Sequence, residues 1–318
     1  MSSVLQATTG PLSGAHTPSA TSEYEHKVWP YRLILPFLFV IGAYVQAKKF
    51  VYRLFGGPTC VPETNCWFID GMSVNSRRVK DGARGWKALD AVYNFRRGGE
   101  GENALIRAVD DFWLQIRNAQ AVRNRLKIVK REVRKAIVEM AKTKAVGEPV
   151  RHLSLAAGSG QGVIEVIAEM QAAGIPCEVL LIDQDESALE HARTLAGAHG
   201  VSASIITRKW DVVYFERALQ GFRPDIIEMC GLLDYLPWTL AVRLTQKIHR
   251  FLKQDGFLLV CHIHSNWEKY FLWHQENWGM LYRSRQQLRE MLTRGGFLEA
   301  DLYAEPHRIH SVAVARRM

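Results

Sequence analysis

Short apolar runs alternate with runs of helical length through the second half of the chain, and this alternation limits the fold more than any other feature. The expected strands lie at residues 150–156, 177–183, 202–207, 225–230 and 256–264, and the helices between them at residues 162–173, 186–198, 213–220 and 239–252. Such an order predicts a parallel sheet with helices on both faces, in which ligands bind at the carboxyl ends of the strands. The sequence therefore predicts an α/β fold.

The order of elements changes after residue 264. A helix is expected at residues 285–294, followed by strands at residues 297–304 and 308–315 with a Glu305-Pro306-His307 turn between them. Two strands joined by a short turn pair as an antiparallel hairpin. We expect this hairpin to lie at one edge of the sheet.

The net charge of +9 is confined to the first half of the chain. Residues 1–150 contain 23 Lys and Arg against 13 Asp and Glu, whereas residues 151–318 contain 18 against 19. This asymmetry predicts two different parts rather than a uniformly basic nucleic-acid binder. We expect a flexible tail at residues 1–26, a basic, mainly helical extension at residues 27–149, and the α/β domain at residues 150–318.

Two further features predict a cytoplasmic protein. Residues 1–22 are rich in Ser, Thr, Gly and Pro, and they lack the basic start and apolar core of a secretory signal. The five cysteines include no C-x-x-C pair, and their spacing matches neither a disulfide framework nor a zinc site. No metal is expected.

An apolar segment interrupts the basic extension. Residues 33–47 carry no charge and are flanked by Lys and Arg. They fall short of the roughly 20 residues that cross a bilayer, and Pro36 weakens the helix. Three hypotheses stay open: the segment packs on the domain or on a second copy in a homodimer, residues 33–53 contact a membrane surface, or the segment spans the membrane.

One long amphipathic helix is expected at residues 105–140, where apolar residues recur every three or four positions. Basic residues occupy its other positions: Arg117, Arg123, Arg125, Lys127, Lys130, Arg131, Arg134 and Lys135. They form either a solvated helix face or a groove for an anionic substrate or an acidic membrane surface.

A glycine-rich loop joins the first strand to the first helix of the α/β domain, with the sequence Leu-Ala-Ala-Gly-Ser-Gly-Gln-Gly at residues 155–162. Such a loop lets the backbone turn sharply and approach a ligand in front of a helix N-terminus. The dinucleotide pattern G-x-G-x-x-G fails at Val163, and no Gly-Lys-Ser/Thr of a P-loop follows.

Residues 154–160 (SLAAGSG) resemble the first motif of class I S-adenosylmethionine (SAM)-dependent methyltransferases, an acid followed by G-x-G-x-G. Gly158 and Gly160 match two of the glycines, whereas Ser154 occupies the acidic position and Ala156 the first glycine. The resemblance implies a Rossmann-like seven-stranded methyltransferase sheet, with SAM as the cofactor. It also implies that another acid replaces the carboxylate usually found near the methionine amino group.

The same resemblance extends to the ends of the next three strands. Asp183 matches the acid that binds the ribose hydroxyls, and a carboxylate can accept two hydrogen bonds from a vicinal diol. Asp211 matches an acid that reaches the adenine amino group, and Trp210 flanks the ring; a helix N-cap is the alternative role for Asp211. Cys230 and Gly231 match the fourth motif, which lines both cofactor and acceptor.

Later motifs resemble one branch of the family, the methyltransferases associated with 3-hydroxy fatty acid methyl esters. These motifs lie at residues 118–125, 231–236, 262–266 and 278–283. From them we expect Asp234, Tyr235, His262 and His264 to form the acceptor side of the site. The two histidines share one strand face, so metal binding, packing, and acid–base or orienting roles are all considered.

Six aromatic residues crowd residues 265–282, and they fit either a buried packing helix or an aromatic lid over an apolar acceptor. Trp278 and Tyr282 are the expected acceptor contacts in this segment. Arg283 at its end is expected to hold an acceptor carboxylate, because a guanidinium binds carboxylates in a forked geometry.

The expected function is transfer of a methyl group from SAM to a small acceptor that is apolar or bears a carboxylate, such as a fatty acid or a secondary metabolite. Three alternatives stay open. They are other SAM-dependent alkyl transfer or cyclisation in the same pocket, a nucleic-acid methyltransferase, and a non-catalytic SAM-binding scaffold. The missing D-P-P-Y type motif argues against nucleic acid as the acceptor.

Overall fold

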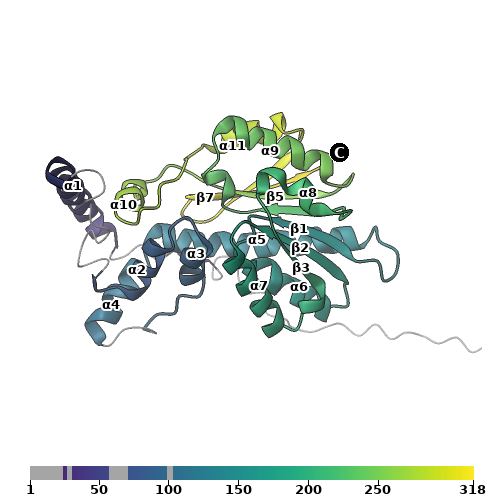
Figure 1. The fold of residues 1–318 in the computed structure, drawn as a ribbon, viewed down its shortest axis with the longest axis horizontal. Coiled ribbons are helices and arrows are strands. Elements are labelled where there is room, and N and C mark those ends of the chain that lie inside the picture. Colours follow the sequence, from purple (N-terminus) through teal and green to yellow (C-terminus); the bar gives the residue numbers. More distant parts are fainter. Residues whose placement is uncertain (1–23, 27–30, 57–70, 99–102) are drawn as a thin grey trace, which may run out of the picture.

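A seven-stranded sheet forms the centre of the molecule in the computed structural model, which describes residues 24–26, 31–56, 71–98 and 103–318 (Figure 1). Its strands are β1 Val150–Leu155, β2 Cys177–Asp183, β3 Ile205–Lys209, β4 Ile226–Met229, β5 Phe257–Ile263, β6 Ala300–Ala304 and β7 His310–Arg316. The strand order is β3-β2-β1-β4-β5-β7-β6. Strands β1 to β5 are parallel, and β7 lies antiparallel between β5 and β6. The predicted α/β fold with an antiparallel edge hairpin is confirmed.

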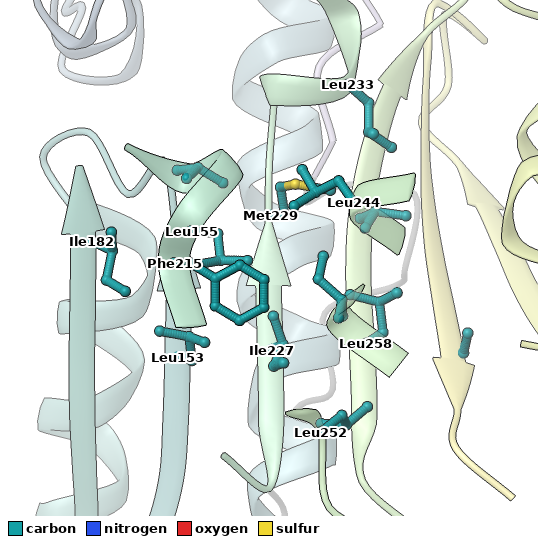
Figure 2. Packing of buried hydrophobic residues seen from close by; sticks show 14 of the residues in the cluster. Leu153, Leu155, Ile182, Phe215, Ile227, Met229, Leu233, Leu244, Leu252 and Leu258 are labelled. Atoms are coloured by element: carbon teal, nitrogen blue, oxygen red, sulfur yellow. The ribbon is translucent and has the colours of Figure 1, made fainter. Parts of the chain in front are cut away.

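Helices cover both faces of the sheet because its central strands are apolar on both sides. In β2, Leu180 and Ile182 face one hydrophobic cluster, and Val179 and Leu181 face the other. The first cluster includes α8 Phe215–Leu219, α9 Trp238–Phe251 and α11 Arg285–Arg294. The second includes α5 Arg117–Ala141, α6 Gln161–Ala172 and α7 Glu186–Ala198. Figure 2 shows the first cluster, where Phe215 packs over Leu153 and Ile227.

The predicted single helix at residues 105–140 is wrong, because the chain breaks it in two. The first helix, α4, covers Ala104–Trp113, and α5 begins at Arg117. The carboxylate of Glu268 accepts the backbone N–H groups of Arg117 at 3.1 Å and Asn118 at 2.8 Å. This distant side chain satisfies donors that a helix start leaves open, so the break depends on tertiary structure.

Helix α5 packs on the sheet with its apolar side, through residues such as Val133 and Ile137. The extension therefore shares a hydrophobic core with the strands that follow residue 149. Of the two alternatives for the basic residues of α5, a solvated face does not describe Arg123 and Arg125, which are buried. Arg123 pairs with Glu25 at 2.7 Å, which fastens the end of the expected tail to α5; residues 1–23 lie outside the described residues.

The remaining helices gather at one end of the sheet (Figure 1). They are α1 Tyr31–Gly56, α2 Val74–Asp81, α3 Trp86–Tyr93 and α10 Lys269–His274. With α4, they contribute to a third hydrophobic cluster that also includes Ile263 of β5. Helix α1 lies beside α10 at the outer end, and in the described part of the chain no helix is long and apolar enough to span a membrane.

Candidate cofactor and acceptor site

A cavity of about 620 Å³ opens at the carboxyl ends of β1, β2 and β4, and continues under α2, α3 and α10. Ten of the residues predicted from the sequence lie on its wall: Ala156, Gly158, Gly160, Asp183, Asp211, Cys230, Gly231, Asp234, Tyr235 and Trp278. The first seven come from the segments expected to hold the cofactor. The sheet thus brings together residues from Ala156 to Tyr235 because its parallel strands end at one edge, and the segment after α10 adds Trp278.

The glycine-rich loop is held in a left-handed backbone conformation at three alternate positions. Ala156, Gly158 and Gly160 have φ angles of 51°, 55° and 62°. A Cβ atom on Gly160 would lie 2.9 Å from Leu181 Cδ1, so both the space and the φ angle favour glycine there. Ala156 takes the same φ region with a side chain, at some cost in backbone strain. The loop backbone therefore lies directly against the cavity.

Asp183 fixes this loop from the end of β2. One carboxylate oxygen, Oδ2, accepts the N–H of Gly158 at 2.8 Å, and the other, Oδ1, accepts the N–H of Asp185 at 2.9 Å. Each oxygen can accept a further hydrogen bond. The half-buried carboxylate can thus orient the loop and still bind a diol in the cavity.

Asp211 forms the N-cap that was its alternative role, and its expected contact with adenine stays a prediction. Its carboxylate accepts the N–H of Val213 at 2.8 Å, which makes it an N-cap, and it also lies on the cavity wall. Trp210 is not among the cavity-lining residues, and its side chain is 41% exposed. Its expected place beside an adenine ring stays a prediction.

The charged wall residues that were not predicted as site residues include Glu228 and Arg125. Glu228 of β4 is the strand partner of Ser154 in β1, and the Ser154 hydroxyl donates to Glu228 Oε2 at 2.6 Å. Burial raises the pKa of Glu228, although hydrogen bonds from Cys230 and Ser154 act in the opposite direction. The sequence pointed to Glu228 only indirectly, because a serine, Ser154, occupies the acidic position of the first motif. It did not show which carboxylate lies beside Ser154.

Arg125 is another unpredicted residue of the wall, and it reaches the cavity from α5. Its guanidinium donates to the Tyr93 hydroxyl at 3.1 Å, and Nη1 lies 4.0 Å from where a Cβ of Gly231 would be. Burial lowers the pKa of Arg125, but the potential of Tyr93, Asp234 and nearby thiols outweighs this and raises it. The side chain is therefore a permanent buried cation.

The other half of the cavity is mainly apolar. Helices α2 to α5 and the segment around α10 line it with the side chains of Val79, Leu89, Val92, Trp113, Ile116, Phe271, Leu272, Trp278 and Met280. Tyr235 and Trp278 stand within this wall, where the Trp278 indole N–H donates to the Tyr235 hydroxyl at 2.5 Å. Burial raises the pKa of Tyr235 to about 12, so its phenol keeps its proton at neutral pH.

Four residues expected to contact the acceptor do not lie on the cavity wall: His262, His264, Tyr282 and Arg283. His262 Nδ1 lies 2.7 Å from Asp234 Oδ1, behind the wall. The guanidinium of Arg283 donates to the backbone carbonyls of Leu233, at 2.7 Å, and Leu236. These contacts position the 232–236 segment, and they engage Arg283 away from any acceptor carboxylate.

His264 is engaged at both ring nitrogens. Nδ1 lies 2.6 Å from the carbonyl oxygen of Arg283, and Nε2 lies 2.7 Å from the Ser311 hydroxyl. Because a carbonyl can only accept, Nδ1 carries the proton and Nε2 accepts from Ser311. Burial lowers the pKa of His264, which favours this neutral form.

The histidine on the cavity wall is instead His310, at the start of β7 and beside Ile263 of β5. Its two ring nitrogens are buried and have no hydrogen-bond partner among the described residues. Burial, followed by the charges of Arg125 and the neighbouring histidines, lowers the pKa of His310 well below its usual value. The ring is therefore neutral. Within the described ranges, no three His, Cys, Asp or Glu side chains are grouped so as to hold a metal ion.

Solved structures of methyltransferases share this fold. The CMeT domain of the citrinin polyketide synthase matches with a TM-score of 0.52 at 17% identity, over 90% of this chain and 69% of that one. Magnesium protoporphyrin IX methyltransferase from Synechocystis PCC 6803, solved with SAH, matches with a TM-score of 0.50 at 12% identity, over 76% and 98%. A structure described as a possible exported protein from Bordetella parapertussis reaches 0.66 at 15% identity, over 92% and 99%.

A family model extends the match to the sequence itself. It is described as "Putative methyltransferase" and matches residues 60–317, which include most of the basic extension as well as the sheet. No curated protein matches the chain. None of these matches mentions 3-hydroxy fatty acid methyl esters, so that narrower resemblance stays a prediction. The family model covers well over half of the 318 residues, and the chain belongs to this methyltransferase family.

Proposed function

We propose that this protein transfers a methyl group from SAM to a small, largely apolar acceptor. The observation that carries the proposal is the continuity of one cavity, which runs from the glycine-rich loop and Asp183 to the apolar wall beneath α2 and α10. Its volume of about 620 Å³ lies in the range of small-molecule sites. The donor set suits SAM: an acid for the ribose, an acid near the adenine, and opposite charges at Glu228 and Arg125.

Bound SAM supplies an activated methyl group on a sulfonium, so the protein mainly has to align the acceptor and exclude water. The apolar wall excludes water. Tyr235 keeps its phenolic proton and can donate it to an acceptor oxygen. The neutral ring of His310 can accept a hydrogen bond from an acceptor hydroxyl, and it can take up the proton as the methyl group arrives. An apolar acceptor with one hydroxyl group fits these neighbours.

The nucleic-acid alternative finds little support in the basic extension. Several basic side chains of α5 are paired within the protein, including Lys130 with Glu165 at 2.7 Å and Arg134 with Glu169. Charges neutralised in this way are not available to phosphates. Cyclisation and a scaffold role would use the same cavity, so an experiment has to separate them.

The proposal is tested by SAM binding and by methyl transfer. We expect calorimetry to detect SAM and SAH binding, and labelled SAM to methylate a member of a panel of fatty acids, hydroxy acids, amines, apolar alcohols and RNA. Absence of SAM binding at millimolar concentration would contradict the proposal. Binding without transfer to any acceptor would favour the scaffold, labelled RNA would favour a nucleic-acid substrate, and SAM turnover without an intermolecular methyl product would indicate cyclisation.

A further inference from the structure

The charge arrangement in the cofactor half of the cavity departs from the usual methyltransferase pattern. Ser154 occupies the position at the end of β1 where the family motif has an acid, and a serine has no charge to pair with an ammonium group. The strand next to β1 supplies a carboxylate at the same level, since Ser154 and Glu228 are register partners in the parallel β1–β4 pair. The 2.6 Å hydrogen bond from Ser154 to Glu228 Oε2 fixes that carboxylate against the end of β1.

Both Glu228 and Arg125 are buried ionisable side chains without an opposite charge in contact. Glu228 is 5% exposed and Arg125 is 3% exposed, and both line the cavity. Among the described residues, Arg125 hydrogen bonds only to the Tyr93 hydroxyl, and neither side chain forms an ion pair. A buried charge is costly unless a partner or ligand compensates it. A ligand that carries both signs would pair with each of these side chains in contact.

We propose that Glu228, positioned by Ser154, binds the ammonium group of the SAM methionine moiety, and that Arg125 binds its carboxylate. The assignment rests on the proposed use of SAM. It explains how the chain retains a cofactor site after Ser154 replaces the acid on β1: the carboxylate moves to the neighbouring strand, and the serine hydroxyl orients it. A fixed guanidinium is well suited to a carboxylate, because two of its N–H groups match the two oxygens.

The test measures, by calorimetry, the affinity of each of three proteins for each of three ligands. The ligands are SAH, SAH without its carboxylate, and SAH without its amino group; the proteins are the wild type, Glu228→Gln and Arg125→Met. The wild type should bind SAH at least about tenfold more tightly than either truncated ligand, about 1.4 kcal/mol for each lost contact. Glu228→Gln should lose the preference for the amino group alone, and Arg125→Met the preference for the carboxylate alone.

Comparing these affinities separates a direct contact from a structural role. A side chain that only supports the fold would weaken all three ligands by the same factor, and that result would overturn the assignment. Glu276→Gln is the matched control, because Glu276 is a buried glutamate on the acceptor side of the same cavity, and its change should leave the affinity ratios unaltered. A wild type that binds none of the ligands would contradict the proposed function itself, whereas wild-type binding with unchanged ratios in both variants would contradict only the assignment.

A second inference comes from a different part of the molecule, the surface of α1. This helix has 26 residues, and among those whose side chains the structure describes only Ile41 and Val45 are buried core residues. Lys49 donates to the backbone carbonyl of His274 at 3.0 Å. Large apolar side chains remain exposed along its length: Leu33, Phe37, Phe39, Val40, Tyr44, Phe50, Val51, Tyr52, Leu54 and Phe55. Exposed apolar patches of this kind mark interaction surfaces.

The basic residues of α1 indicate which kind of partner this apolar surface binds. Residues 31–56 contain four basic residues and no acidic one. A second copy of α1 would repel these charges, whereas anionic lipid headgroups attract them, and the apolar side chains can enter the acyl boundary. We infer that α1 lies on an anionic membrane surface without crossing it, which would bring the cavity close to an apolar acceptor dissolved in lipid.

Cosedimentation with vesicles tests this inference. We expect the protein to bind vesicles of phosphatidylcholine with phosphatidylserine, to bind pure phosphatidylcholine about tenfold more weakly, and to release as salt rises. Phe37→Glu with Phe55→Glu should abolish binding. Leu298→Glu, at a residue 71% exposed outside α1, is the matched control and should not change it. A lipid-free dimer that dissociates in the double variant, without vesicle binding by the wild type, would overturn the inference.

Discussion

Replacing Asp183 with alanine is expected to weaken SAM binding about a hundredfold. Two charge-assisted hydrogen bonds to the ribose hydroxyls would be lost, together about 3 kcal/mol. The loop would loosen as well, because Asp183 accepts the Gly158 N–H at 2.8 Å. Calorimetry with SAM, adenosine and adenine measures the change. Adenosine should weaken with SAM, whereas adenine, which lacks the ribose, should lose only the smaller loop contribution.

Asp183→Asn separates the two roles of this side chain. Asparagine keeps an oxygen for the Gly158 N–H but lacks the charge for the ribose, so its SAM affinity should fall between those of the wild type and Asp183→Ala. Unchanged SAM affinity in a folded Asp183→Ala protein would remove Asp183 from the cofactor site. Circular dichroism at rising temperature checks that the variants are folded.

Replacing His310 with leucine is expected to lower the turnover number about a hundredfold and to leave SAM affinity within about twofold, as for the loss of a positioned proton acceptor. The neutral ring lies on the acceptor part of the wall, and its nitrogens have no partner among the described residues. The measurement is kcat with the acceptor found in the labelling panel. A smaller loss is expected with an acceptor that is already ionised, since it needs no base.

His152→Leu is the matched control for this prediction. His152 is also fully buried in the sheet without a hydrogen-bond partner for its ring, and burial lowers its pKa to about 3. It does not line the cavity. Its replacement should therefore affect stability but not turnover. Equal losses of turnover in the two variants would indicate a general packing effect and would contradict a specific role for His310.

The cofactor half of the cavity was predictable from the sequence because its signals are local. The left-handed loop at Gly158 and Gly160 follows directly from glycines between a strand and a helix, and Asp183 and Asp211 follow strands whose ends must meet at one edge. The strand bounds of β2 and the helix bounds of α7 and α11 agree with the predicted residues for the same reason. Periodicity depends on neighbours a few positions away.

The acceptor half was predicted less well because side-chain direction depends on packing. His262 lies on β5 as expected and His264 directly follows the strand, yet the residue on the cavity wall is Ile263 between them. His310 reaches the wall through the antiparallel pairing of β7 with β5, where it stands opposite Ile263. That register joins residues 47 positions apart, and no local pattern encodes it.

By itself, the sequence determined the order of strands and helices in the α/β domain, the edge hairpin, the glycine-rich loop and the family, because each depends on residue types at short spacing. Only the tertiary structure decided which side chains are in contact. Glu268 accepts hydrogen bonds from Asn118, 150 positions away, where α5 begins, and Ser154 donates to Glu228, 74 positions away. Arg125 lines the cavity and is not part of a solvated basic face. These contacts arise when the sheet and its helices pack together and buried polar groups must find partners or ligands.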